Sequence, residues 1–319
     1  MKPKEILLLG ASGQIGRNLI RKLTANNFKV TAVTRNLHSK GYLLKTQGNP
    51  GYIEIIEANI FEDNNLRDLI KNSDICINLI GILFEKKNNT FQNIHVNLPD
   101  IISKHCSEYK LDQLIHVSAL AVENAKDSLY ARSKTEGERV VKDNFPKATI
   151  LKPSLVYSID DNFTTTFMNL LNISPIFPLY YSGKTKFTPI HVSDLSEIIN
   201  KVVLNNINSE TIQCIGPEVI NFKEIIKKLL NSIKKKRFLI PMPLILGKIT
   251  ASLMEAVMPN PLITKDQLRL LKYDNIVSDK YKTNFELDMP AQLKFEEEIN
   301  KYAYMWREEG QFAKIENNQ

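Results

Sequence analysis

The chain has 319 residues, of which 43% are apolar, and a formal net charge of +7. This length and apolar content allow a large buried core, in one domain or two unequal ones. Three widely spaced cysteines without a C-x-x-C pair argue against a disulfide framework, and five histidines without ligand spacing argue against a metal site. The basic residues are spread along the chain, so we expect no nucleic-acid partner.

The first predicted element is a buried strand over residues 6–9, which runs into Gly10-x-x-Gly13-x-x-Gly16 and a predicted helix over Gln14–Ala25. Glycines between a strand and a helix permit a tight turn, a close approach of backbone to pyrophosphate, and tight helix–strand packing. The helix start adds unpaired N–H groups and a positive dipole end. We interpret this segment as the phosphate site of a dinucleotide; a chance glycine turn is the alternative.

The second predicted strand, Lys29–Thr34, ends at Arg35, and no acidic residue occurs between Phe28 and Tyr52. An acidic residue at this position would bind the adenosine 2′-hydroxyl, whereas a basic one suits a 2′-phosphate. The sequence therefore favours NADP(H) over NAD(H). Arg17 offers a second cation near the phosphates, and ordinary surface positions are the alternative for both arginines.

Four further strands are predicted over residues 53–58, 75–80, 113–118 and 149–152, and they alternate with helices over 66–71, 97–109 and 130–144. We expect the remaining residues of this half to form loops. Strands that alternate with helices predict an α/β fold with a Rossmann-type doubly wound parallel sheet. We assign residues 1–153 to this nucleotide-binding domain.

Tyr130 and Lys134 are four residues apart on a predicted helix, and therefore project from the same face. An ammonium beside a phenol favours the phenolate and lowers the tyrosine pKa toward a value useful for proton transfer. Ser118, at the end of the fifth strand, could polarise a substrate carbonyl. We predict these three residues as catalytic; an ordinary pair on a helix surface is the alternative for Tyr130 and Lys134.

Residues 154–319 predict a smaller mixed α/β region that binds substrate or a partner and is interleaved with the first domain. It has a proline-rich part over residues 173–189, a helix over Val192–Leu204, a short strand over 211–215, and mostly helix thereafter. A basic run, residues 234–237, precedes an apolar stretch over 238–258 that prolines and charges interrupt, so it predicts no membrane-spanning helix. We expect an ordinary buried helix there, with a membrane-facing or partner-facing edge as the alternative.

Taken together, these motifs resemble the extended short-chain dehydrogenase/reductase superfamily over nearly the whole chain. Asn78-Leu79-Ile80-Gly81, Asn97, Lys152-Pro153-Ser154 and the segment Pro189 to Asp194 add to the likeness. The resemblance implies that Lys134 holds the nicotinamide ribose and that the Lys-Pro segment borders the nicotinamide. The residues assigned to the cofactor are Gly10, Ser12, Gly13, Gln14, Ile15, Gly16, Arg17, Arg35, Asn59, Ile60, Leu79, Ile80, Gly81, Asn97, Tyr130, Lys134, Lys152, Pro153 and Ser154.

Within the superfamily, the chain is most similar to the atypical group that contains the nucleotide-binding accessory subunit of respiratory complex I, alpha-subcomplex subunit nine. His116 to Leu120, Tyr130 to Glu138 and above all Pro261 to Ser278 carry this likeness. Membership implies a firmly held NADPH that serves structure rather than turnover, and docking to the peripheral arm near the membrane. The chain begins Met-Lys-Pro-Lys, so we expect no signal peptide and a cytoplasmic location, which membership would extend to the cytoplasmic face of the inner membrane.

The first functional hypothesis is therefore a non-turnover subunit or assembly partner of a membrane-bound NADH:quinone oxidoreductase. The alternative is an NADP-dependent reductase of a carbonyl or quinone-pathway compound, which the Tyr130/Lys134 pair supports. A sugar-nucleotide epimerase is less well supported, because the acidic residue typical of NAD binding is missing after the second strand.

Overall fold

In a computed structural model of the chain, the structure describes residues 3–87, 89–258, 261, 263–308 and 310. The chain divides into two compact units. The first unit comprises residues 1–153, 192–215 and 277–291, and the second comprises residues 154–191, 216–276 and 292–319. Two segments of the C-terminal half thus fold with the first unit.

The first unit contains one parallel sheet with the strand order β14-β11-β6-β5-β4-β1-β2-β3. This order confirms the predicted Rossmann-type doubly wound sheet. Two strands from the C-terminal half, β11 and β14, extend the six that we expected. The strands are β1 (Glu5–Leu9), β2 (Lys29–Thr34), β3 (Ile53–Glu57), β4 (Ile75–Asn78), β5 (Gln113–Val117), β6 (Thr149–Pro153), β11 (Thr211–Cys214) and β14 (Lys282–Thr283).

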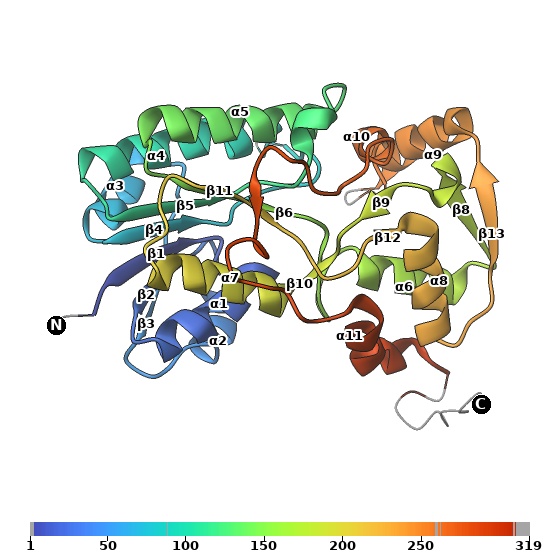
Figure 1. The fold of residues 1–319 in the computed structure, drawn as a ribbon, viewed down its shortest axis with the longest axis horizontal. Helices are drawn as coiled ribbons and strands as arrows, with labels where there is room; N and C mark the ends of the chain where they lie inside the picture. The colour runs from blue at the N-terminus through green and yellow to red at the C-terminus, as the bar shows by residue number, and fades with distance from the viewer. Residues whose placement is uncertain (1–2, 88, 259–260, 262, 309, 311–319) are drawn as a thin grey trace. The chain divides into compact units, whose positions relative to one another are not determined.

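Helices cover both faces of this sheet (Figure 1). On one face α3, α4 and α5 pack on β1, and Leu7, Leu9, Leu66, Ile102 and Val141 are fully or almost fully buried in one cluster. On the other face α7 packs beside α1, and an ion pair between Lys22 and Glu197 connects the two helices. The helices of the first unit are α1 (Gln14–Ala25), α2 (Leu37–Lys45), α3 (Asp63–Lys71), a π-helix η1 (Gln92–Asn97), α4 (Leu98–Glu108), η2 (Val122–Asn124), α5 (Leu129–Asn144) and α7 (Val192–Leu204).

Several local predictions for the first unit are wrong. Residues 37–45, expected as loop, form helix α2, which Asn36 caps by accepting a hydrogen bond from the backbone N–H of Ser39. The helix expected from residue 97 is preceded by the π-helix η1, and α3 begins three residues before the expected start. Strands β3, β4 and β5 end one or two residues before the expected bounds, so residues 58 and 79–80 lie just beyond the carboxyl ends of β3 and β4, and residue 118 just beyond that of β5.

In its described residues the second unit has three two-stranded sheets and a core of its own. Aliphatic and aromatic side chains share that core, in which Phe167, Phe177 and Phe222 contact one another edge to face or tilted. Its elements are β7 (Val156–Tyr157), α6 (Thr164–Ile173), β8 (Ile176–Tyr180), η3 (Tyr181–Gly183), β9 (Lys186–Phe187), β10 (Ile190–His191), β12 (Ile220–Asn221), α8 (Phe222–Ser232), β13 (Phe238–Met242), α9 (Leu244–Val257), α10 (Lys265–Leu270), α11 (Phe295–Tyr302) and η4 (Ala303–Trp306).

The stretch Pro261 to Ser278, on which the resemblance to the complex I subunit group mainly depends, lies mostly within the second unit. Its residue Leu262 lies outside the described residues. Thr264 and Gln267 form a reciprocal capping box at the start of α10. The Asn275 side chain accepts a 2.6 Å hydrogen bond from the Ser154 hydroxyl. These contacts hold the stretch in a defined path.

The apolar stretch over residues 238–258 is not the buried helix that we expected. It forms strand β13 followed by helix α9, and α9 buries only its small residues Gly247 and Ala251. Large apolar side chains of α9, among them Ile245 and Leu253, are exposed. The helix packs on its own unit through a narrow face.

Candidate nucleotide-binding site

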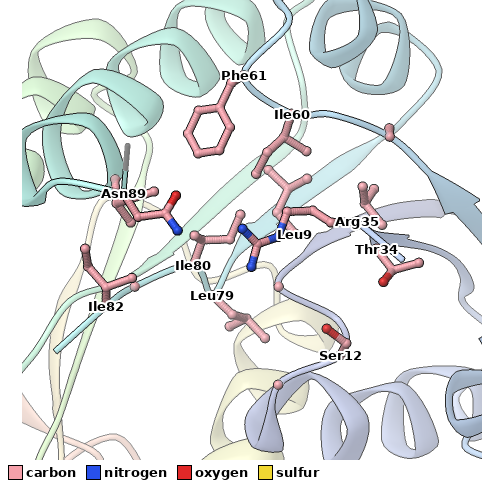
Figure 2. A pocket seen from close by; sticks show the side chains of 16 residues that line it. Leu9, Ser12, Thr34, Arg35, Ile60, Phe61, Leu79, Ile80, Ile82 and Asn89 are labelled. Atoms are coloured by element: carbon pink, nitrogen blue, oxygen red, sulfur yellow. The ribbon is translucent and has the colours of Figure 1, made fainter. Parts of the chain in front are cut away.

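A cavity of about 260 Å³ lies at the carboxyl ends of β1, β2, β3 and β4, within the first unit (Figure 2). This is where ligands bind in open α/β sheets. Eight residues of the predicted cofactor set line it: Gly10, Ser12, Gly13, Arg35, Ile60, Leu79, Ile80 and Gly81.

The glycine loop has the geometry that a phosphate site requires. Gly10 adopts φ +84°, and the backbone N–H of Gly13 donates to the carbonyl of Gly10 at 3.0 Å, which closes the turn. A Cβ on Gly16 would lie 2.5 Å from the Ala11 carbonyl oxygen, so only glycine lets α1 pack so closely on the loop. The start of α1 therefore presents its backbone N–H groups beside the cavity.

Arg35 reaches from the end of β2 into the cavity, where its guanidinium lies near Ile80 (Figure 2). No acidic side chain is among the described residues that line the cavity. The cavity thus offers a planar cation, the hydroxyls of Ser12 and Thr34, and apolar walls. Such a lining suits an anionic ligand with a flat apolar part.

Other predicted cofactor residues do not line this cavity. Gln14, Ile15, Gly16 and Arg17 belong to α1, and Gly16 acts through packing. The Asn59 amide donates to Glu62 and its oxygen accepts from the backbone N–H of Phe61, which shapes the turn after β3. Asn97 exchanges hydrogen bonds with Gln92 and Asn93 in the π-helix. Ser154 belongs to the second unit, where its hydroxyl contacts Asn275.

Several lining residues were not predicted. Val33, Thr34, Ala58 and Phe61 lie at or just beyond strand ends, so the rule that ligands bind at the carboxyl ends of strands could have found them. Asn89 points into the cavity from a tight hairpin in which its backbone pairs with Lys86 (Figure 2). The asparagines of this polar run are typical of turns, but nothing in the sequence predicts that Asn89 lines the cavity. The remaining unpredicted lining residues are Leu9, Ile82 and Ile94.

Lys134 connects this cavity to the predicted catalytic residues. A Cβ on Gly81, which lines the cavity, would lie 3.3 Å from the Lys134 Nζ. The Lys134 ammonium is buried and donates to the backbone carbonyl of Val117 at 3.1 Å, one residue before Ser118. The end of β5 and the helix α5 are therefore close together, as the prediction required.

Ser118 is engaged within the protein. Its hydroxyl donates to the Glu138 carboxylate at 2.5 Å, and Glu138 lies one turn beyond Lys134 on α5. The buried Lys152 ammonium forms ion pairs with Glu138 at 3.0 Å and with Glu123 at 2.9 Å. Lys152, predicted at the nicotinamide, thus lies at the centre of a network of buried and half-buried charges.

The tyrosine pKa moves opposite to our expectation. Burial raises the pKa of the Tyr130 hydroxyl above its ordinary value, and the Glu138 carboxylate raises it further. Burial lowers the pKa of Lys134 to about 8, and Glu138 offsets only part of that fall. The phenol is therefore held in its neutral form, because a nearby carboxylate and a low-dielectric surrounding both disfavour the phenolate.

His95 in the π-helix is a site residue that sequence reasoning missed. Its Nε2 accepts from the backbone N–H of Ile82 at 3.1 Å, so Nδ1 carries the proton and donates to the Ser133 hydroxyl at 2.8 Å. The ring meets that of Tyr130 edge to face. Burial and the Lys134 charge lower the pKa of His95 to about 2. His95 is thus a neutral side chain whose hydrogen bonds connect Ile82, which lines the cavity, to Ser133 on α5.

Helix α5 also approaches the π-helix very closely. A Cβ on Gly137 would lie 2.0 Å from the His95 carbonyl oxygen. Only glycine permits this approach, which fixes Tyr130 and Lys134 relative to the loop that contains Gly81. Across the described part of the chain, no group of His, Cys, Asp and Glu side chains is arranged to hold a metal ion.

Comparison with known families identifies the chain. Residues 4–217, two thirds of it, match the family described as RmlD substrate binding domain. The chain belongs to this family. The resemblance inferred from the sequence is thereby confirmed, and two groups of proteins refine it.

Among curated relatives of this RmlD-type chain is the NADH-ubiquinone oxidoreductase 40 kDa subunit of Neurospora crassa, 26% identical over 90% of the chain and 76% of the relative. The mitochondrial NADH dehydrogenase (ubiquinone) 1 alpha subcomplex subunit 9 of mouse is 26% identical over 94% and 81%. These relatives are subunits of complex I by name, as the sequence resemblance predicts.

Solved structures share the fold. A complex of a UDP-glucuronic acid 4-epimerase variant from Bacillus cereus with NAD superposes with a TM-score of 0.69 and 18% identity, over 95% of this chain and 98% of that one. A dTDP-glucose 4,6-dehydratase from Streptomyces venezuelae, also with NAD bound, gives a TM-score of 0.69 and 15% identity, over 95% and 96%. They support the fold of the RmlD-type chain.

Proposed function

We propose that the protein is a nucleotide-binding accessory subunit of a respiratory NADH:quinone oxidoreductase, complex I, and that it holds NADPH mainly as a structural group. The glycine loop, the cavity at the strand ends and the names of the relatives support this proposal. The proposed location is peripheral, on the cytoplasmic face of the inner membrane, with peripheral-arm subunits as partners. In the described part of the chain no helix is long and apolar enough to cross a membrane.

The observation that carries the structural role is the hydrogen bond from Ser118 to Glu138. A serine that polarises a substrate carbonyl must direct its hydroxyl at that oxygen, but here the hydroxyl donates to a carboxylate. The raised pKa of Tyr130 has a related effect, because it makes the phenol a weaker proton donor. Both features favour a retained nucleotide over turnover.

NADPH rather than NADH is the proposed nucleotide because of Arg35. Its guanidinium can bind a 2′-phosphate through two parallel hydrogen bonds, and no described acidic lining residue competes for the ribose. The N-terminal N–H groups of α1 would take the pyrophosphate, and Lys134, close to Gly81, would take the nicotinamide ribose.

The proposal predicts that the protein co-purifies with stoichiometric NADPH and co-migrates with complex I on a native gel. The nucleotide released on denaturation is identified by chromatography and its redox state by absorbance. Against a broad panel of quinones and carbonyl compounds, the bound NADPH should stay reduced. Steady oxidation with any acceptor, or purification without a nicotinamide nucleotide, would contradict the structural role.

A second candidate function is an NADP-dependent reductase, favoured by the buried Lys134 beside Gly81 and by Tyr130 on the same helix. A nicotinamide coenzyme supplies hydride to a carbonyl or quinone, and the Tyr130 hydroxyl would supply the proton. Tyr130→Phe should then abolish turnover and leave NADPH bound. If no acceptor reacts with the unmodified protein, this function is excluded and the subunit role stands.

The variant Lys134→Met tests whether the lysine contributes to nucleotide binding or to the stability of the fold. Lowering its pKa from 10.5 to about 8 costs the charged form about 3 kcal/mol. Methionine removes that cost and leaves the Val117 carbonyl without this donor, which costs about 1–2 kcal/mol. We therefore expect the nucleotide-free variant to be equally stable or about 1–2 kcal/mol more stable in denaturant unfolding at pH 7, while NADPH binds roughly tenfold more weakly.

Lys142→Met on the same helix is the matched control, since its Nζ donates to the Thr211 hydroxyl and does not approach the cavity. It should leave NADPH affinity unchanged. A nucleotide-free Lys134→Met protein that is several kcal/mol less stable would show that the lysine serves the fold instead.

A further inference from the structure

Helix α9 in the second unit exposes an apolar stripe. Ile245, Ile249, Leu253 and Val257 recur every four residues and are 74%, 59%, 65% and 72% exposed. Residues at this spacing lie on one side of a helix. In an ordinary amphipathic helix of a globular protein such a stripe faces the core, whereas on α9 it faces outward.

The inner side of α9 explains this orientation. Gly247 and Ala251 are buried, and a Cβ on Gly247 would lie 2.5 Å from the Tyr180 ring at the end of β8. The small size of these two residues therefore lets α9 pack closely on its unit. Turning the stripe inward would place branched side chains against Tyr180, where at Gly247 not even a methyl group fits, so the stripe faces outward.

Further exposed apolar side chains lie on β13, which leads directly into α9. Phe238, 75% exposed, and Ile240 alternate with the less exposed Leu239, and Phe238 is in register with the exposed Ile176 of β8. Ile173, at the end of α6, is also exposed. We call the surface formed by the α9 stripe, Phe238, Ile240, Ile173 and Ile176 the α9 face. Large exposed apolar surfaces of this kind mark interaction sites.

The charges around the α9 face are predominantly positive. Glu255 is paired with Lys265, and Glu308 with Lys235, so these carboxylates are neutralised. Lys236, before β13, and Lys248, on α9, are exposed, and no acidic partner of either is found in the described part of the chain. A surface that combines exposed apolar side chains with lysines complements a bilayer with anionic headgroups.

We propose that the α9 face docks on the surface of a lipid bilayer that contains anionic lipids, with α9 lying in the interface plane. Fourteen helical residues span about 21 Å, too short to cross the hydrocarbon core but suited to an interfacial helix. This docking gives a physical basis to the proposed peripheral location. It rests on the surface of the second unit and does not depend on nucleotide binding.

Flotation of the full-length protein with vesicles tests the docking. Vesicles of equal parts phosphatidylglycerol and phosphatidylcholine should bind the protein more tightly than phosphatidylcholine alone, and added salt should weaken the binding. The double variant Ile249→Asp/Leu253→Asp should bind at least about tenfold more weakly, because it removes two buried apolar contacts. Both positions are exposed, so the variant should fold.

The matched control is Ile159→Asp/Val219→Asp, which adds the same charge at two exposed apolar residues outside the α9 face. Its binding to anionic vesicles should weaken only modestly, by the salt-sensitive repulsion that two added negative charges cause. Lys236→Gln/Lys248→Gln should weaken binding to anionic vesicles by roughly fivefold per lysine and leave binding to neutral vesicles unchanged.

Three results would overturn the docking: no binding to anionic vesicles, equal loss in the α9 and control variants, or a dimer in sedimentation that the α9 variant dissociates. The last would mean that a second copy of the chain covers the face. Nucleotide content and co-migration with complex I are measured on the same proteins. A protein that fails to bind vesicles but keeps NADPH and co-migrates refutes the docking alone.

Discussion

Replacing Arg35 with serine should weaken NADPH binding by about 10- to 100-fold and change NADH binding by less than about threefold. A hydrogen bond to a charged group contributes roughly 1.5–3 kcal/mol, and each 1.4 kcal/mol is a factor of ten in affinity. Arg35 reaches into the cavity, and we expect it to face only the 2′-phosphate that distinguishes the two nucleotides. Titration calorimetry of the nucleotide-free protein measures both affinities.

Arg17→Ser is the informative comparison, because Arg17 lies on α1 and does not line the cavity. We expect its NADPH affinity to change by less than about threefold, because its side chain does not line the cavity and solvent ions screen its charge. Equal losses for NADPH and NADH in the Arg35 variant would mean that the guanidinium binds a part common to both nucleotides. The assignment of the 2′-phosphate would then be wrong.

The sequence was sufficient to predict the structure of those segments that local patterns determine. The bounds of α1 and α7 were predicted to the residue, because both helices have regular apolar periodicity. That Gly16 permits close packing of the helix also followed from the motif, since its contact with the backbone of Ala11 in the loop after β1 involves only neighbours in the chain. The cavity end of the candidate site was therefore largely predictable.

Long-range contacts were not predictable. In the sequence Glu138 was only the last residue of a motif, yet its carboxylate accepts hydrogen bonds from the Ser118 hydroxyl, just after β5, and from the Lys152 ammonium on β6. The direction of the Tyr130 pKa shift depends on this carboxylate and on burial, and neither can be derived from a tyrosine and a lysine four residues apart. His95 was hidden because its role requires the π-helix, which has no simple sequence signature.

Helix α9 illustrates a different limit. Its composition is that of a core helix, and only the position of Gly247 and Ala251 against Tyr180 reveals which side is inward. Apolar content predicts that a surface will be removed from water, but not what covers it.

Lys152→Met should lower the free energy of unfolding by about 3–5 kcal/mol, the largest stability effect that we expect at a single position. The ammonium is almost fully buried and paired with Glu123 and Glu138. Methionine preserves much of the volume but leaves two carboxylates facing each other without their cation, and removing one partner of a buried ion network is strongly destabilising. Denaturant unfolding at pH 7 measures the loss, and Lys142→Met, which removes a half-exposed lysine on α5, should lose less than about 1 kcal/mol.

The pH dependence of this loss identifies its origin. Burial raises the pKa of Glu123, but the hydrogen bond from Lys152, a backbone hydrogen bond and the charges of Lys152 and Lys280 together outweigh burial and hold that pKa below its ordinary value of 4.5. A carboxyl with a lowered folded-state pKa contributes stability above its unfolded pKa and loses that contribution as pH falls through the folded value. The variant lacks this contribution, so its deficit relative to the unmodified protein should be full near pH 7 and shrink below about pH 4.5. A deficit that stays constant down to pH 3 would show that the variant loses packing, and that the charges around Lys152 contribute little to the fold.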